Sequence, residues 1–151
     1  MKILKFEPKD AIQVCNLIHN TADNIMKHYE SQASIDALKE ERTPEKLLEK
    51  LNNRDYIIAQ ANGKIIGVGG IKDNEIRSMF VDYNYIRQGI GTKIIVALEN
   101  IAKKNKHKKI IVKANAGAIG FYKKMGYISI KEYDEIVGKS TYRVILMEKL
   151  I

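Results

Sequence analysis

The chain has 151 residues, 45% of them apolar, and this length suits one globular domain spanning residues 1–151. The lone Cys15 excludes an intramolecular disulfide, and three scattered histidines give no basis for a metal site. No apolar run approaches the roughly 20 residues of a membrane-spanning helix, and the acidic segment 7–10 interrupts any signal-peptide core. We therefore expect a cytoplasmic protein without a membrane segment.

The formal net charge of +8 attracts polyanions, which include nucleic acid, anionic membranes and phosphate-rich cofactors. Five lysines crowd into residues 103–109, between a predicted helix and a predicted strand, where cations complement the helix dipole. Helix-turn-helix, zinc-finger and aromatic RNA-binding signatures are absent from the sequence. A nucleic-acid-binding module, whose affinity would fall steeply with salt, is therefore only an alternative interpretation.

The N-terminal part is predicted to hold a strand followed by helix. Residues 2–6 are expected to form the strand, and Asp10 is expected to cap the helix with Gln13 as its capping-box partner. Apolar residues then recur at helical spacing over 11–29. This pattern fits either one helix or two helices that break near Asn20.

A short helix and a three-stranded meander are predicted next. Thr-Pro-Glu opens the helix over 43–51, with Thr as N-cap and Pro in the first helical position. Strands over 56–61 and 64–71 flank Asn62-Gly63, a strong signal for a two-residue hairpin. A second turn leads into a third strand over 75–81.

The period changes after the meander, and elements alternate to the end of the chain. The sequence predicts helices and strands over residues 90–105 (helix), 109–113 (strand), 117–125 (helix), 127–133 (strand) and 142–148 (strand). This order indicates a mixed α/β fold.

The turn before the first of these helices has the composition of an anion-binding loop. Glycines let the backbone approach a ligand, and the N–H groups at a helix N-terminus attract phosphate. The residues concerned are Arg87, Gln88, Gly89, Ile90, Gly91 and Thr92. By itself Gly-x-Gly also fits a plain tight turn. A dinucleotide fingerprint would need glycine at Ile94, and no P-loop occurs.

A second motif, Asn115-Ala-Gly-Ala-Ile-Gly-Phe-Tyr-Lys-Lys-Met-Gly-Tyr127, follows some thirty residues later. With the Arg-Gln-Gly-Ile-Gly turn it resembles the two core motifs of the bacterial GNAT (N-acetyltransferase) superfamily, over about residues 75–133. The resemblance implies a central, mostly antiparallel sheet of about seven strands flanked by helices. One position departs from the family, which usually has Arg or Gln where this chain has Ile86. We expect Ile86 to weaken one phosphate contact without abolishing the site.

The resemblance implies direct transfer of acetyl from acetyl-CoA, the co-substrate, to an amine through a tetrahedral intermediate, with no metal. Met79 and Val81 match the strand positions whose backbone binds the pantetheine arm, beside a bulge that polarises the thioester carbonyl. Residues 87–92 match the pyrophosphate loop, and Asn115 matches an asparagine that contacts pantetheine.

Tyr122 matches the tyrosine that protonates the leaving thiolate, although an aromatic on this helix also fits a core position. Glu75 stands where protein-acetylating members often hold their base, and strict strand alternation would put it on the face of Met79. A solvated carboxylate at the strand end is the alternative for Glu75. Asp82 and Glu30 are further candidates for the base.

A non-catalytic acyl-CoA-binding sensor on the same fold is the second hypothesis. The amine stays unidentified, whether small molecule, polyamine or protein, and specificity is expected from the first helices and a loop over 134–140. The closing strand 142–147 is apolar on both faces, so it should be covered within the sheet or by a second subunit. A homodimer is therefore also expected.

Overall fold

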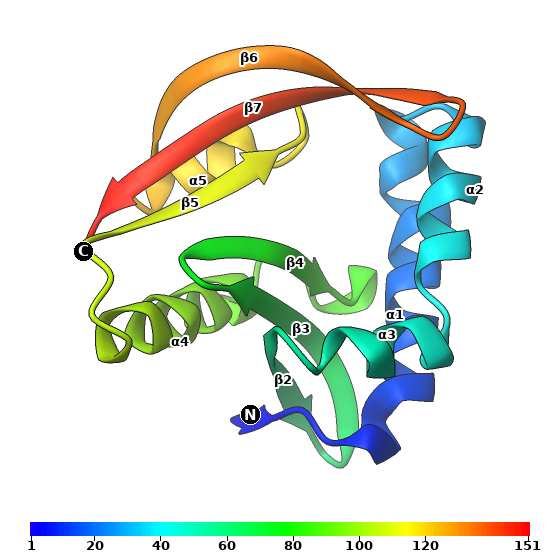
Figure 1. Cartoon of the computed structure of the whole chain (residues 1–151). Coiled ribbons are helices and arrows are strands. Elements are labelled where there is room, and N and C mark those ends of the chain that lie inside the picture. The colour runs from blue at the N-terminus through cyan, green and yellow to red at the C-terminus, as the bar shows by residue number, and fades with distance from the viewer.

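The computed structural model describes residues 1–136 and 138–151 in full and, of residue 137, only its backbone within a strand. Seven strands form one sheet in the order β1-β2-β3-β4-β5-β7-β6 (Figure 1). The strands are β1 (Lys2–Lys5), β2 (Asp55–Ala61), β3 (Lys64–Lys72), β4 (Glu75–Val81), β5 (Lys109–Ala114), β6 (Ile128–Val137) and β7 (Ser140–Leu150). Only the β4–β5 pair is parallel, so the expected mixed, mostly antiparallel sheet is confirmed.

Helices cover both faces of this sheet. The helices are α1 (Ala11–Asn24), α2 (Gln32–Glu41), α3 (Pro44–Lys50), α4 (Ile90–Lys104) and α5 (Ile119–Lys124), with short 3-10 turns at Pro8–Asp10, Met26–His28 and Tyr83–Tyr85. Helices α1 and α3 pack with Tyr56 and Ile58 of β2 and with Ile65 and Val68 of β3 into one apolar cluster. Helices α4 and α5 form the larger cluster on the opposite face, together with side chains of β3, β4, β5 and β7.

The N-terminal half departs from the sequence prediction in two ways. The capping box of Asp10 with Gln13 is wrong, because the Asp10 carboxylate accepts a hydrogen bond from the Glu7 N–H (2.8 Å) instead. Helix α1 passes through Asn20 without a break and ends at Asn24. Helix α2 was not predicted, although its N-cap is clear: the Ser31 hydroxyl accepts from the Ser34 N–H (3.1 Å).

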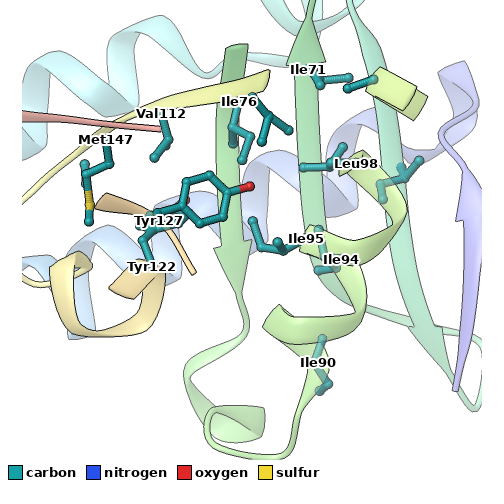
Figure 2. Packing of buried hydrophobic residues seen from close by; sticks show 14 of the residues in the cluster. Ile71, Ile76, Ile90, Ile94, Ile95, Leu98, Val112, Tyr122, Tyr127 and Met147 are labelled. Atoms are coloured by element: carbon teal, nitrogen blue, oxygen red, sulfur yellow. The ribbon is translucent and has the colours of Figure 1, made fainter. Parts of the chain in front are cut away.

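The central meander follows from local chemistry. Asn62 and Gly63 both have positive φ (52° and 75°), as a two-residue hairpin turn requires. Strand β3 then lies directly under α4, because a Cβ built on Gly67 would lie only 2.7 Å from Ile94 Cδ1. Figure 2 shows the residues of α4 that fill this face: Ile90, Ile94, Ile95 and Leu98, with Ile71 of β3 and Ile76 of β4.

Strand β7 lies inside the sheet, between β5 and β6. Its residues Val144, Ile145 and Met147 are buried, so one chain already covers both of its faces. The apolar pattern of β7 therefore needs no second subunit, and the homodimer stays a prediction. The expected loop over 134–140 is wrong, because β6 continues to Val137 and β7 begins at Ser140 in a tight hairpin.

Candidate active site

Strands β4 and β5 begin side by side and then separate. They pair only at Glu75 with Ile111 and at Ile76 with Val112, and Figure 1 shows them diverging beyond that point. A cavity of about 340 Å³ occupies the separation. Its walls come from β4, from the end of β5, from α1 and from Tyr122 of α5.

The edge of β4 that faces this cleft carries backbone groups free to bind a ligand. The Asp82 N–H donates to the Ile66 carbonyl (2.9 Å), which makes these two residues a hydrogen-bonded pair with β3. Since such pairs alternate in an antiparallel ladder, the N–H and C=O groups of Met79 and Val81 point away from β3 and toward the cleft. Of these groups, the Val81 carbonyl accepts from the Thr21 hydroxyl (3.4 Å).

A β-bulge interrupts β4 at Arg77. Gly70 pairs with Ser78 while the next residue, Ile71, pairs with Ile76, so Arg77 is the extra residue. The bulge reverses the alternation of side chains. Ile76 and Met79 therefore pack on the same α4 face, and Glu75 lies on the opposite one. The expectation that Glu75 shares the face of Met79 is wrong for this reason.

The glycine turn leads from β4 into α4 in a left-handed conformation. Gly89 is the N-cap of α4 with φ of 79°, and Arg87 also has a positive φ of 61°. The first intrahelical bond runs from the Lys93 N–H to the Gly89 carbonyl (3.2 Å), so the N–H groups of residues 90–92 have no partner within the helix. These groups can bind an anion. Ile86 lines the cleft and gives it an apolar wall.

Tyr122 stands at the cleft from the α5 side. Its side chain is only 4% exposed, and its ring packs edge-on against Phe121 and Tyr127 at centroid distances of 5.2 and 5.4 Å. Burial raises the pKa of the Tyr122 phenol, which therefore keeps its proton at neutral pH. Among the described residues its hydroxyl has no hydrogen-bond partner, so it is free to donate into the cleft.

Asn115 follows β5 and lines the same cleft. Its Oδ1 atom is buried and has no hydrogen-bond partner within the described part of the chain. Buried polar atoms are normally paired, so an unpaired acceptor here points to a ligand with a donor group. Asn115 therefore suits the ligand contact that the sequence predicted for it.

A second cavity, of about 510 Å³, adjoins the cleft on the α1 and α2 side of the sheet. Arg77, Lys113, Ala114 and Asn115 are among the residues that line both. Glu30 and Glu75 line the second cavity. Burial raises the pKa of the Glu30 carboxyl, whereas Glu75 pairs with Arg77 at 3.0 Å.

Asp82, the third carboxylate that the sequence proposed, has a structural role. It accepts from the Asn84 N–H at 2.9 Å and pairs with Lys64 at 3.4 Å, and it lies outside the linings of both cavities. Sequence reasoning missed a group of cations at one end of the second cavity, which is made up of Arg42, Lys50, Arg54 and Arg77. They come from separate elements and form no motif along the chain.

Comparison with known proteins places the chain in a family. The model of the acetyltransferase (GNAT) domain matches residues 22–150. No curated protein matches the chain. Within the part of the chain that the structure describes, no helix is long and apolar enough to cross a membrane. Nor does this part contain a group of three or more His, Cys, Asp or Glu side chains that could hold a metal ion.

Solved structures share the fold at low sequence identity. A GCN5-related N-acetyltransferase from Rhodopseudomonas palustris matches with a TM-score of 0.93 and 20% identity, over 99% of this chain and 95% of that one. The PaiA N-acetyltransferase from Thermoplasma acidophilum, in complex with coenzyme A, matches with a TM-score of 0.84 and 20% identity, over 99% and 98%. An aminoglycoside 6'-N-acetyltransferase complexed with coenzyme A gives 0.74 and 16%, over 99% and 97%. With the family model covering most of the sequence, the chain belongs to the GNAT acetyltransferase family.

Proposed function

We propose that this chain transfers the acetyl group of acetyl-coenzyme A directly to the nitrogen of an amine. The observation that carries the proposal is that one cleft is lined by the free backbone edge of β4, by Ile86 of the glycine turn and by Tyr122. Two proteins of the same fold contain coenzyme A, which supports the choice of co-substrate.

The residues of the cleft fit the chemistry of this co-substrate. An extended chain with amide groups suits an unpaired strand edge, here the backbone of Met79 and Val81. A pyrophosphate suits the N–H groups of the first turn of α4 after Gly89. The unpaired Asn115 Oδ1 suits an amide N–H.

Proton transfer is assigned to side chains on either side of the sheet. Tyr122 is protonated at neutral pH, since burial raises its pKa further above that value, and it gives its proton to the sulfur as the thioester C–S bond breaks. Either Glu75 or Glu30 takes the proton from the amine. Glu75 pairs with Arg77 at 3.0 Å, and the raised pKa of Glu30 makes its carboxylate a stronger base once it is ionised.

Two measurements test the proposal. Coenzyme A at about 100 times its Kd should stabilise the fold by roughly 2.7 kcal/mol, which raises the Tm by about 5–10 °C for a protein of this size. Acetyl-CoA with a panel of amines should release free thiol. A Tm shift without thiol release from any amine would indicate a non-catalytic sensor, and the absence of any shift would reject the acyl-CoA interpretation.

A further inference from the structure

The second cavity has a strongly basic end. Arg42 lies at the C-terminus of α2, Lys50 in the last turn of α3, Arg54 just before β2 and Arg77 at the bulge of β4. All four line the cavity of about 510 Å³. Four separate parts of the chain therefore bring cations to one cavity. Lysines and arginines that only keep a helix solvated would not converge in this way.

Three of these cations form no ion pair with a described residue, although Glu41 lines the same cavity and its carboxylate partly offsets the charges of Arg42 and Lys50. Arg77 pairs with Glu75, but Arg42, Lys50 and Arg54 have no carboxylate within 4.0 Å among the described residues. The Nε atoms of Arg42 and Arg54 are buried and make no hydrogen bond to any described residue. Buried N–H donors are normally paired, so these two Nε atoms leave this end of the cavity open to a ligand that accepts hydrogen bonds.

The pKa of Lys50 reflects this arrangement. Burial and the neighbouring Arg42 and Arg54 lower the pKa of its ammonium from 10.5 to about 8. Burial likewise lowers the pKa of Arg42. A bound anion would relieve both effects, because an opposite charge nearby favours the charged form of each base.

The other end of the cavity adjoins the cleft. Glu30 lies there with no ion pair to a described residue, and Ala114 and Asn115 line both spaces. The cavity therefore has three cations beside the single carboxylate of Glu41 at its α2 and α3 end, and Glu30 as an acceptor for an amine proton elsewhere in its wall.

We propose that the acetyl acceptor is a small amine that also carries an anionic group, a carboxylate or a phosphate, and that Arg42, Lys50 and Arg54 bind this group. The inference rests on the proposed function and adds the substrate class to it. Polyamines are disfavoured as acceptors, because their additional ammonium groups would meet the cations of this cavity. Bidentate Arg contacts suit carboxylate and phosphate equally, so the two groups are distinguished by experiment.

Matched acceptors test this inference in the thiol-release assay. β-Alanine is compared with β-alaninamide, phosphoethanolamine with ethanolamine, and spermidine serves as the polycation. The anionic member of at least one pair should show a kcat/KM at least tenfold above its neutral partner, and the pair with the larger ratio identifies the anion. Spermidine should be the poorest acceptor.

Variants of the cavity residues test whether they cause the preference for anionic acceptors. Arg54→Gln and Lys50→Gln should each raise KM for the anionic acceptor on the order of 10-fold to 100-fold, since hydrogen bonds to charged groups are the strong ones. The neutral partner should change little. Lys103→Gln, which removes the same charge from an exposed position at the end of α4, is the matched control and should alter neither acceptor.

The outcomes separate this inference from the proposed function. If neutral amines or spermidine release thiol as fast as the anionic amines, the substrate class is wrong and the acetyltransferase proposal stands. If no amine releases thiol but coenzyme A raises the Tm, calorimetric binding of the same matched pairs to the coenzyme A complex decides the substrate class, and equal binding overturns it. If coenzyme A does not bind, the proposed function itself fails.

Discussion

Replacing Tyr122 by phenylalanine would remove one oxygen from the cleft and keep the ring that packs there. The ring contacts Phe121 and Tyr127 edge-on, and both contacts survive in the variant. Since the hydroxyl has no hydrogen-bond partner among the described residues, its loss breaks no internal hydrogen bond. The free energy of unfolding should therefore change by less than about 1 kcal/mol.

The catalytic effect should be far larger than the effect on stability. The loss of a general acid lowers the rate by about 10²–10⁴, which corresponds to roughly 3–5 kcal/mol of transition-state stabilisation. This loss should appear in kcat and not in the KM for acetyl-CoA, because the phenol acts only when charge develops on sulfur. Steady-state thiol release measures kcat, and the Tm shift with coenzyme A checks that binding persists.

Tyr127→Phe is the matched control, because it removes a phenol oxygen from the neighbouring buried ring. The Tyr127 hydroxyl donates to Glu99 Oε1 (3.0 Å), so this variant should lose about 1.5–3 kcal/mol of stability while turnover is kept. Full turnover in Tyr122→Phe would show that Tyr122 only packs. An equal loss of coenzyme A binding would assign its hydroxyl to binding instead.

Three further changes probe the turn, the basic cavity and the core. Gly89→Val places a Cβ at φ of 79° and should abolish most of the coenzyme A Tm shift, whereas Gly138→Val, at φ of 62° in the β6–β7 turn, should keep it. Lys50 releases its proton near pH 8 when folded but near 10.5 when unfolded, so the folded state binds fewer protons between these values. Urea unfolding should therefore show stability rising with pH across this window, with a smaller slope in Lys50→Gln. Glu99→Ala should cost about 3–5 kcal/mol, seen as a Tm fall of more than roughly 6 °C, because the buried Glu99 carboxylate accepts from both Lys149 Nζ (3.0 Å) and the Tyr127 hydroxyl (3.0 Å), and hydrogen bonds to a charged group contribute about 1.5–3 kcal/mol each. Glu99→Met combined with Lys149→Met should recover most of that loss, and a stable Glu99→Ala would refute the buried-pair argument.

Local signals in the sequence predicted most of the elements. The Asn62-Gly63 turn, the Thr43 cap and the apolar face of α4 each depend on residues close together in the chain, and all three are confirmed. Helix α2 was missed because only Ser34 and Ile35 of its ten residues are buried, which leaves a weak apolar stripe. The position of β7 between β5 and β6 depends on pairing between distant segments, which periodicity cannot report.

The candidate site also contains residues that local motifs reveal and residues that only the folded chain brings together. The glycine turn and Tyr122 could be found because each belongs to a contiguous motif. The orientation of Glu75 could not, because one extra residue at Arg77 reverses the strand alternation. The basic cavity could not be found either, since Arg42, Lys50 and Arg54 meet only after α2, α3 and β2 have packed against one another.

The place of β7 in the sheet also constrains how the chain acquires its structure. Strand β6 pairs with β7 and with no other strand of the sheet. During synthesis, residues 128–137 therefore emerge before the strand with which they pair. Their backbone hydrogen bonds can form only after residues 140–150 have been made. Until then the backbone N–H and C=O groups of β6 are unpaired, beside apolar side chains such as Ile128 and Ile130 that stay exposed in the finished fold. Substitutions that weaken β7 should therefore lower the yield of soluble protein from newly made chains more than they lower the stability of chains already folded.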